Sequence, residues 1–265
     1  IPRLFADTAL LKNPLIAFGY SGYLMKMGSA DEAIRILEQA NGLSDISFML
    51  LAYRLGYAKL CRGDKDAVNH LLKFASSFKG RNYLRSGFRF IAWYFLLNDE
   101  QKKYDQFISD VLFVGNTTIE EDKEATRESK ERRVPDKQLL RARLFYDGGF
   151  FRNAETELMS ITTSSLRDRT DSVEFDYRSA RTAHALGDTS SAVNKYSRAY
   201  LQGQFLHSHY AANSALQLGM IYEGRGEKAT AREWFVKCLH LPPHDYQSGI
   251  SQKAKAGLAR LGDAR

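Results

Sequence analysis

Apolar and small residues recur at helical spacing along most of the chain. The clearest stretch is ALQLGMIYEGRGEKATAREWFVKCLHLPP, residues 215–243, whose spaced positions are Leu218, Gly219, Tyr222, Gly226, Ala231 and Phe235. The first three share one face of a helix, because positions i, i+1 and i+4 lie close together on a helix surface. Glycine tolerates the left-handed conformation that ends a helix, so Gly226 predicts a turn. The stretch therefore predicts two packed helices.

The same offsets recur upstream. In each clear copy a glycine is followed five residues later by alanine and four residues after that by a large residue: Gly28, Ala33 and Leu37; Gly149, Ala154 and Leu158; Gly187, Ala192 and Tyr196. Two weaker copies run through Gly63, Ala67 and Leu72, and through Asn98, Lys103 and Phe107. Successive alanine positions, with Lys103 in the third copy, are 34, 36, 51, 38 and 39 residues apart. The chain is thus predicted to be a helical repeat protein.

This spacing resembles the tetratricopeptide repeats, whose period is about 34 residues. The resemblance is best over 215–243, where Ala215 and Cys238 replace an aromatic and a small residue of the pattern, and it is degenerate over 84–110. It implies an all-α fold, a right-handed superhelical solenoid of about six helical hairpins. The stripe Ile250, Ala254 and Leu258 predicts a C-terminal capping helix over residues 245–262, because solenoids cover their last hairpin.

The long interval between the third and fourth copies locates an insertion. We expect three hairpins over residues 1–115, a charged insertion over 116–137, and three hairpins with the capping helix over 138–265. The insertion offers only Ile119, Ala125 and Val134 as apolar anchors. A helix that is polar all round is solvent-bridging or poorly ordered, so we expect an exposed helix or a mobile excursion.

Composition adds three limits. No apolar run reaches the roughly 18–20 residues of a membrane-spanning helix. The two cysteines, Cys61 and Cys238, provide no disulfide framework. The net charge of +7 and pI near 9.3 suggest an acidic partner, although such a balance also favours solubility. The sequence starts at Ile1, which leaves a signal peptide or an upstream domain open, so no compartment is predicted.

No catalytic, cofactor or metal site is predicted. GRGEKAT, residues 224–230, resembles a phosphate loop, but it lacks the Gly-Lys-Ser/Thr order and joins two helices, so we interpret it as a hairpin turn. Residue types that bind zinc gather in the last third of the chain: His207, His209, Cys238, His240 and His244. Their spacing matches no zinc motif, and surface histidines with a core cysteine are the favoured interpretation. We therefore do not expect an enzyme.

The resemblance implies that the first helix of each hairpin lines a groove. The groove candidates are aromatic and arginine residues: Tyr53, Arg54, Tyr57, Arg85, Phe88, Arg89, Arg143, Tyr146, Tyr177, Arg178 and Arg181. Arg81, Arg85 and Arg89 form a row on one helix at i, i+4 and i+8. Arginine beside aromatic rings suits carboxylates, phosphates and peptide backbones. The alternative is that these arginines solvate a face and pair with local acids.

Binding is the expected function. The favoured hypothesis is a non-enzymatic scaffold that binds a protein or peptide partner in this groove, and the basic charge favours an acidic partner. The alternative is a nucleic-acid (RNA) binder, suggested by the basic pI and the arginine row. The clamp positions that tetratricopeptide proteins use for chaperone tails hold mainly Leu, Phe, Tyr, Arg and Gly here, so such tails are not the expected ligand. The oligomeric state is not predicted.

Overall fold

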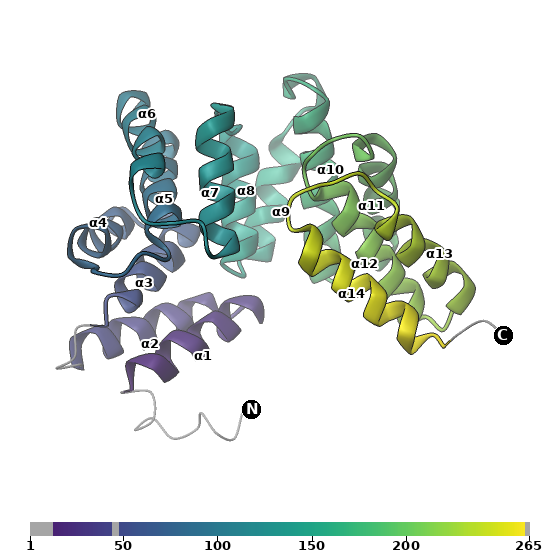
Figure 1. Cartoon of the computed structure of the whole chain (residues 1–265), viewed down its shortest axis with the longest axis horizontal. Coiled ribbons are helices and arrows are strands. Elements are labelled where there is room, and N and C mark those ends of the chain that lie inside the picture. The colour runs from purple at the N-terminus through teal and green to yellow at the C-terminus, as the bar shows by residue number, and fades with distance from the viewer. Residues whose placement is uncertain (1–12, 44–47, 263–265) are drawn as a thin grey trace. The chain divides into compact units, whose positions relative to one another are not determined.

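The computed structural model describes residues 13–43 and 48–262, and every regular element in these ranges is a helix. The chain divides into two compact units, unit 1 up to Phe150 and unit 2 from Phe151 (Figure 1). The predicted all-α fold is confirmed. Within the described residues, no helix combines the length and the apolar character needed to cross a membrane.

Unit 1 contains three successive hairpins and two further helices. Its elements are α1 (Pro14–Lys26), α2 (Ala30–Leu43), α3 (Leu50–Arg62), α4 (Ala67–Ser77), α5 (Leu84–Leu97), α6 (Gln101–Asp110), the short 3-10 helix η2 (Val111–Phe113), α7 (Glu120–Glu131) and α8 (Lys137–Asp147). Helices α1 and α2, α3 and α4, and α5 and α6 pack as pairs. Gly56 of α3 allows α4 to approach closely, since a Cβ atom at this position would lie 2.7 Å from Cγ of Leu71 on α4.

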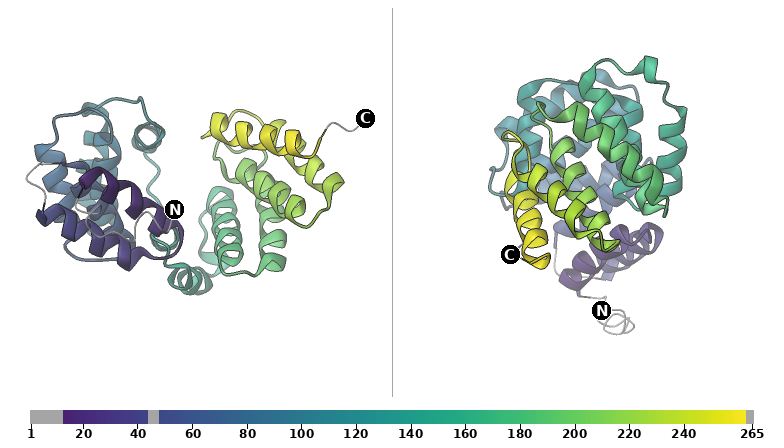
Figure 2. Two further views of the ribbon diagram at one scale, coloured as in Figure 1. Left: turned by 90° about the horizontal axis from the view of Figure 1, so that it is seen from below. Right: turned by 90° about the vertical axis from the view of Figure 1, so that its right-hand side faces the viewer.

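Unit 2 contains two complete hairpins between flanking helices. Its elements are α9 (Phe151–Ser160), the 3-10 helix η3 (Thr163–Ser165), α10 (Arg169–Ala185), α11 (Thr189–Gly203), α12 (Tyr210–Gly224), α13 (Lys228–Leu239) and α14 (Gln247–Arg260). Helix α14 packs against both α12 and α13 and buries Ile250 and Ala254, as predicted for a capping helix (Figure 2, yellow).

The turns between paired helices follow the repeat pattern. All five glycines predicted to end the first helix of a hairpin have a left-handed backbone, with φ between 77° and 88°: Gly28, Gly63, Gly149, Gly187 and Gly226. Residues 225–227 accordingly form the turn between α12 and α13, which confirms the interpretation of GRGEKAT as a hairpin turn.

The division between the units lies in the loop between α8 and α9. Helix α8 packs against α3 and so belongs to unit 1, although the repeat pattern pairs it with α9 as a fourth hairpin. The predicted arrangement of three hairpins, an insertion over residues 116–137 and three further hairpins stays a prediction. The compact units instead divide at Phe150–Phe151.

Candidate partner-binding surface

The predicted arginine row lies on and before α5. The helix begins at Leu84, so Arg81 precedes it and is exposed. Arg85, Arg89 and Trp93 follow at helical spacing, and we call these three residues the arginine face of α5. The prediction that Arg81 lies on the same helix as Arg85 and Arg89 is therefore wrong.

The sequence suggested that Arg89 is a groove residue. In the structure it is buried, because α7 packs against α5. It is only 2% exposed, and its Nη1 atom lies 2.9 Å from Oε2 of Glu124 and 3.7 Å from Oε2 of Glu128. Its guanidinium carbon lies 4.6 Å from the centre of the Trp93 ring. The expectation of an exposed arginine is wrong for Arg89, which pairs instead with glutamates of α7 that are distant in the sequence.

The charged insertion is a packed helix. Helix α7 lies beside α5 (Figure 1) and also contacts α6 and η2, and it buries Asp122, Glu124, Ala125, Thr126 and Ser129. The prediction of an exposed helix or a mobile excursion is therefore wrong. The prediction considered only apolar anchors, but polar groups are also buried when they have hydrogen-bonding or charged partners.

Asp122 of α7 caps α5 from outside the hairpin. Its two carboxylate oxygens accept hydrogen bonds from the backbone N–H of Tyr83 at 2.7 Å and of Ser86 at 2.8 Å. The residue preceding α5, Tyr83, has a left-handed backbone (φ 70°) and makes no side-chain cap of its own. A carboxylate at a helix N-terminus satisfies unpaired donors and complements the helix dipole. Asp122 thus replaces the missing cap.

Arg85 and Thr126 continue the same interface. Nε of Arg85 donates to the backbone carbonyl of Val114 at 2.9 Å, and its Nη1 donates to Oγ1 of Thr126 at 2.8 Å. Both arginines predicted for α5 therefore make polar contacts with α7 or with the segment that precedes it.

Trp93 and Glu128 complete a cluster that α8 also enters. The indole Nε1 of Trp93 donates to Oε1 of Glu128 at 2.7 Å. Arg143 of α8 donates from Nη2 to Oε1 of Glu124 at 2.9 Å, and its guanidinium carbon lies 4.8 Å from the centre of the Trp93 ring. Burial raises the pKa of Glu128 above its ordinary value, while the nearby Arg89 and Arg143 and the indole hydrogen bond oppose the rise.

The other groove candidates of unit 1 serve internal packing. Tyr53 is buried and shares a 3.1 Å hydrogen bond with the Ser86 hydroxyl. Tyr57 donates to Oδ2 of Asp147 on α8 at 3.2 Å. The remaining three are half-buried: Arg54, Phe88 and Tyr146. Arg54 and Phe88 contact rings outside this cluster, Phe18 of α1 and Phe107 of α6, so the predicted candidates of unit 1 do not form one groove.

The candidates of unit 2 lie on α10. Tyr177 is in the core, where its hydroxyl accepts a hydrogen bond from Asn213 of α12. Arg178 is buried, and its Nε donates to Oε1 of Glu174 at 2.6 Å. Arg181 is half-buried, with its guanidinium carbon 5.6 Å from the centre of the Tyr177 ring.

Sequence reasoning missed a matching row on α12, although the repeat period points to it. Helix α10 packs against α12, and three residues of each helix occupy equivalent positions of successive hairpins. We call this set the unit 2 stripe: Glu174, Arg178, Arg181, Asn213, Gln217 and Met220. Met220 is 45% exposed, whereas most of α12 around it is buried.

The histidines and Cys238 make contacts that suit structural roles. The described residues include no group of three or more His, Cys, Asp or Glu side chains that could hold a metal ion. Nδ1 of His207 lies 3.3 Å from the carbonyl oxygen of Pro243, and Nδ1 of His240 lies 2.8 Å from that of Val236. The Cys238 thiol donates to the carbonyl oxygen of Ala212 at 3.3 Å.

Both thiols should resist alkylation in the folded protein. Burial raises the pKa of Cys238 to about 12 and raises the pKa of Cys61 well above its ordinary value. Because only the thiolate is nucleophilic, we expect iodoacetamide at pH 8 to leave both residues unmodified until urea unfolds the chain. Peptide mapping measures the extent of reaction. Equal rates in native and unfolded protein would contradict the buried positions.

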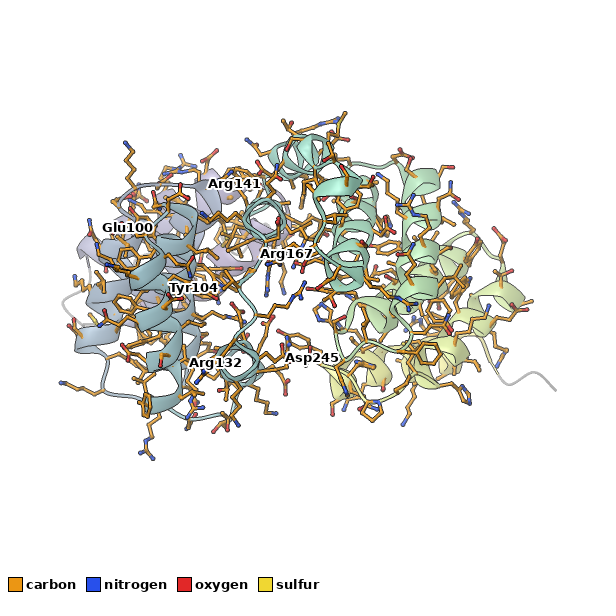
Figure 3. The ribbon with its side chains drawn as sticks, turned by 90° about the horizontal axis from the view of Figure 1, so that it is seen from above. Glu100, Tyr104, Arg132, Arg141, Arg167 and Asp245 are labelled. Atoms are coloured by element: carbon orange, nitrogen blue, oxygen red, sulfur yellow. The ribbon has the colours of Figure 1, made fainter. Side chains whose placement is uncertain are left out.

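A small pocket of about 290 Å³ lies between α6 and α7. Tyr104 of α6 and Arg132, just after α7, are among its lining residues (Figure 3), together with Ile108, Ser129 and Val134. Cofactor and drug-sized ligands occupy pockets of about 300–1,000 Å³. The pocket is therefore at or below the lower end of that range.

No family model matches the chain, and no curated protein sequence matches it. One solved structure, the "TPR2AB-domain:pHSP90-complex of yeast Sti1", aligns with 97% of this chain and 99% of that chain, at 14% identity and a TM-score of 0.38. A structural similarity with so low a TM-score does not support a conclusion about function. The fold assignment rests on the helices described above.

Proposed function

We propose that this protein is a non-enzymatic scaffold that binds a segment of a partner protein on the unit 2 stripe. Repeated hairpins commonly offer the surface of successive first helices as one extended binding face. The observation that carries the proposal is the exposure of Met220 in one row with Asn213 and Gln217 on α12, a helix that packs against α10, which carries Arg178 and Arg181.

The chemistry of the stripe supports a peptide ligand. Asn213 and Gln217 have amide groups that can both donate to and accept from a peptide backbone. Met220 offers a flexible apolar contact of the kind found on adaptable binding surfaces. Arg181, which lies beside the Tyr177 ring, adds positive charge and suits an acidic partner.

Nucleic-acid binding is not favoured by the contacts of three groove arginines, of which Arg89 belongs to the row that suggested it. Arg89 and Arg143 contact Glu124, and Arg178 contacts Glu174. Each of these arginines already has a carboxylate partner and would have to give it up to bind phosphate. Retention on heparin that falls steeply with salt would support nucleic-acid binding instead.

Site-specific photo-crosslinking tests the scaffold proposal. A photoreactive amino acid replaces Met220 on the stripe, or Leu201 on α11, which is 62% exposed but lies on the second helix of a hairpin. We expect irradiation of the full chain in its source cells to give a discrete crosslinked partner from position 220 and none from position 201. Mass spectrometry identifies the partner. Equal crosslinking from both positions, or none from position 220, would contradict the proposal.

A further inference from the structure

Helix α7 is held in unit 1 chiefly by polar contacts. Its buried residues are Asp122, Glu124, Ala125, Thr126 and Ser129, so alanine is the only apolar side chain among them. Burial of an alanine side chain contributes little, since hydrophobic stabilisation is proportional to the apolar area removed from water. Hydrogen bonds and ion pairs with α5 and α8 therefore determine where α7 lies.

The arginine face of α5 requires carboxylates from whatever covers it. The N-terminus of α5 receives its cap from Asp122, Arg89 contacts Glu124 and Glu128, and the indole of Trp93 donates to Glu128. A buried charge or donor without a partner is costly. A different helix on this face would therefore need acidic groups at the same positions, which are separated by two and four residues along α7.

The connections of α7 allow it to leave α5 without unwinding its neighbours. Residues 114–119 separate it from η2 and residues 132–136 separate it from α8, and both segments are outside the helices. The covalent connection still gives α7 a high effective concentration at the face, of the order of millimolar for short flexible linkers. A competing helix binds measurably only when it overcomes this local competition.

We infer that the arginine face of α5 is a binding site for a partner helix with an acidic face, and that α7 occupies this site as an internal competitor. The inference rests on the proposed scaffold function and adds the chemical class of a partner and the way its access is regulated. It concerns unit 1 alone, so its outcome is independent of crosslinking at Met220 in unit 2.

A synthetic peptide with the α7 sequence tests the inference. The probe is fluorescein-labelled NTTIEEDKEATRESKE, residues 116–131, added to the full chain with α7 weakened by Asp122→Asn, Glu124→Gln and Glu128→Gln. We expect the peptide to bind this triple variant at least about tenfold more tightly than wild type, a difference of about 1.4 kcal/mol. A peptide with the same three neutral residues should not bind.

A matched control separates the position of the carboxylates from total charge. Glu120→Gln, Glu121→Gln and Glu131→Gln also remove three negative charges from α7, but all three residues are exposed. We expect the peptide to bind this variant no more than about twofold better than wild type, because surface charges at these positions act weakly. Equal binding to the two triple variants would overturn the inference.

A second variant covers the case in which the triple variant does not fold. Ala125→Pro disrupts α7 as a helix but keeps every charge, because proline removes a helical hydrogen bond and clashes with the preceding turn. We expect the wild-type peptide, and not its neutral form, to raise the melting temperature of this variant, since a ligand of the native state stabilises it. A folded variant whose melting temperature neither peptide changes would overturn the inference.

Discussion

Replacing Arg89 by methionine should lower the free energy of unfolding of unit 1 by about 3 kcal/mol, because it removes one partner of a buried ion-pair cluster. Methionine fills much of the arginine volume but leaves Glu124 and Glu128 beside an apolar side chain. Glu124 keeps its contact with Arg143, at 2.9 Å, so the expected loss lies at the lower end of the range for such changes.

The matched control is Arg81→Met, because Arg81 belongs to the same sequence row but is exposed before the start of α5. We expect this change to act within about 0.5 kcal/mol. Urea unfolding measures both variants through Trp93 fluorescence after Trp234→Phe removes the other tryptophan of the chain. Equal effects at the two positions would show that the buried cluster does not stabilise unit 1.

The loss caused by Arg89→Met should also depend on pH. Burial already raises the pKa of Glu128, and removing Arg89 deletes the largest opposing influence. A carboxyl whose pKa is higher in the folded than in the unfolded state stabilises the fold at low pH and loses that contribution as the pH rises. The difference between wild type and variant should therefore shrink as the pH falls from neutral towards the ordinary pKa of glutamate.

Replacing Phe235 by alanine should destabilise unit 2 by about 3–5 kcal/mol, the usual cost of removing a buried phenylalanine ring. The ring is fully buried between two glycines on separate helices. A Cβ atom on Gly219 of α12 or on Gly257 of α14 would lie 2.5 Å from ring atoms of Phe235. Loss of the ring therefore leaves a cavity between α12, α13 and α14.

The neighbouring residue Val236 supplies the control, because it lies on the same helix and is 38% exposed. We expect Val236→Ala to change the stability by no more than about 0.5 kcal/mol. Hydrogen exchange measured by mass spectrometry reports the stability of α12 and α13 directly. Similar protection of these helices in both variants would contradict the packing role of Phe235.

The repeat pattern predicted the hairpins because their packing leaves a regular mark in the sequence. Gly219 and Phe235 must stay complementary in size for α12 and α13 to approach, and Gly226 must adopt a positive φ at the turn, where it is 79°. These constraints recur with each hairpin. Periodicity therefore located the paired helices, the turn glycines and the capping helix.

The same pattern could not show which polar residues are buried. Arg89 and Arg81 are indistinguishable by spacing, yet the first is buried against α7 and the second is exposed. The difference depends on Glu124, which is far from both in sequence and lies in a segment without apolar periodicity. Long-range ion pairing leaves no local signal, so the sequence could not show that Arg89 is buried.

The most direct test that this fold binds a partner helix on the arginine face is hydrogen exchange of residues 120–131. It is measured in the wild-type chain with and without a saturating acidic helical peptide. We expect exchange to accelerate in α7 while α5 stays protected, because the peptide takes the place of α7 on the arginine face. Unchanged protection of α7 while the peptide is bound would contradict that binding mode.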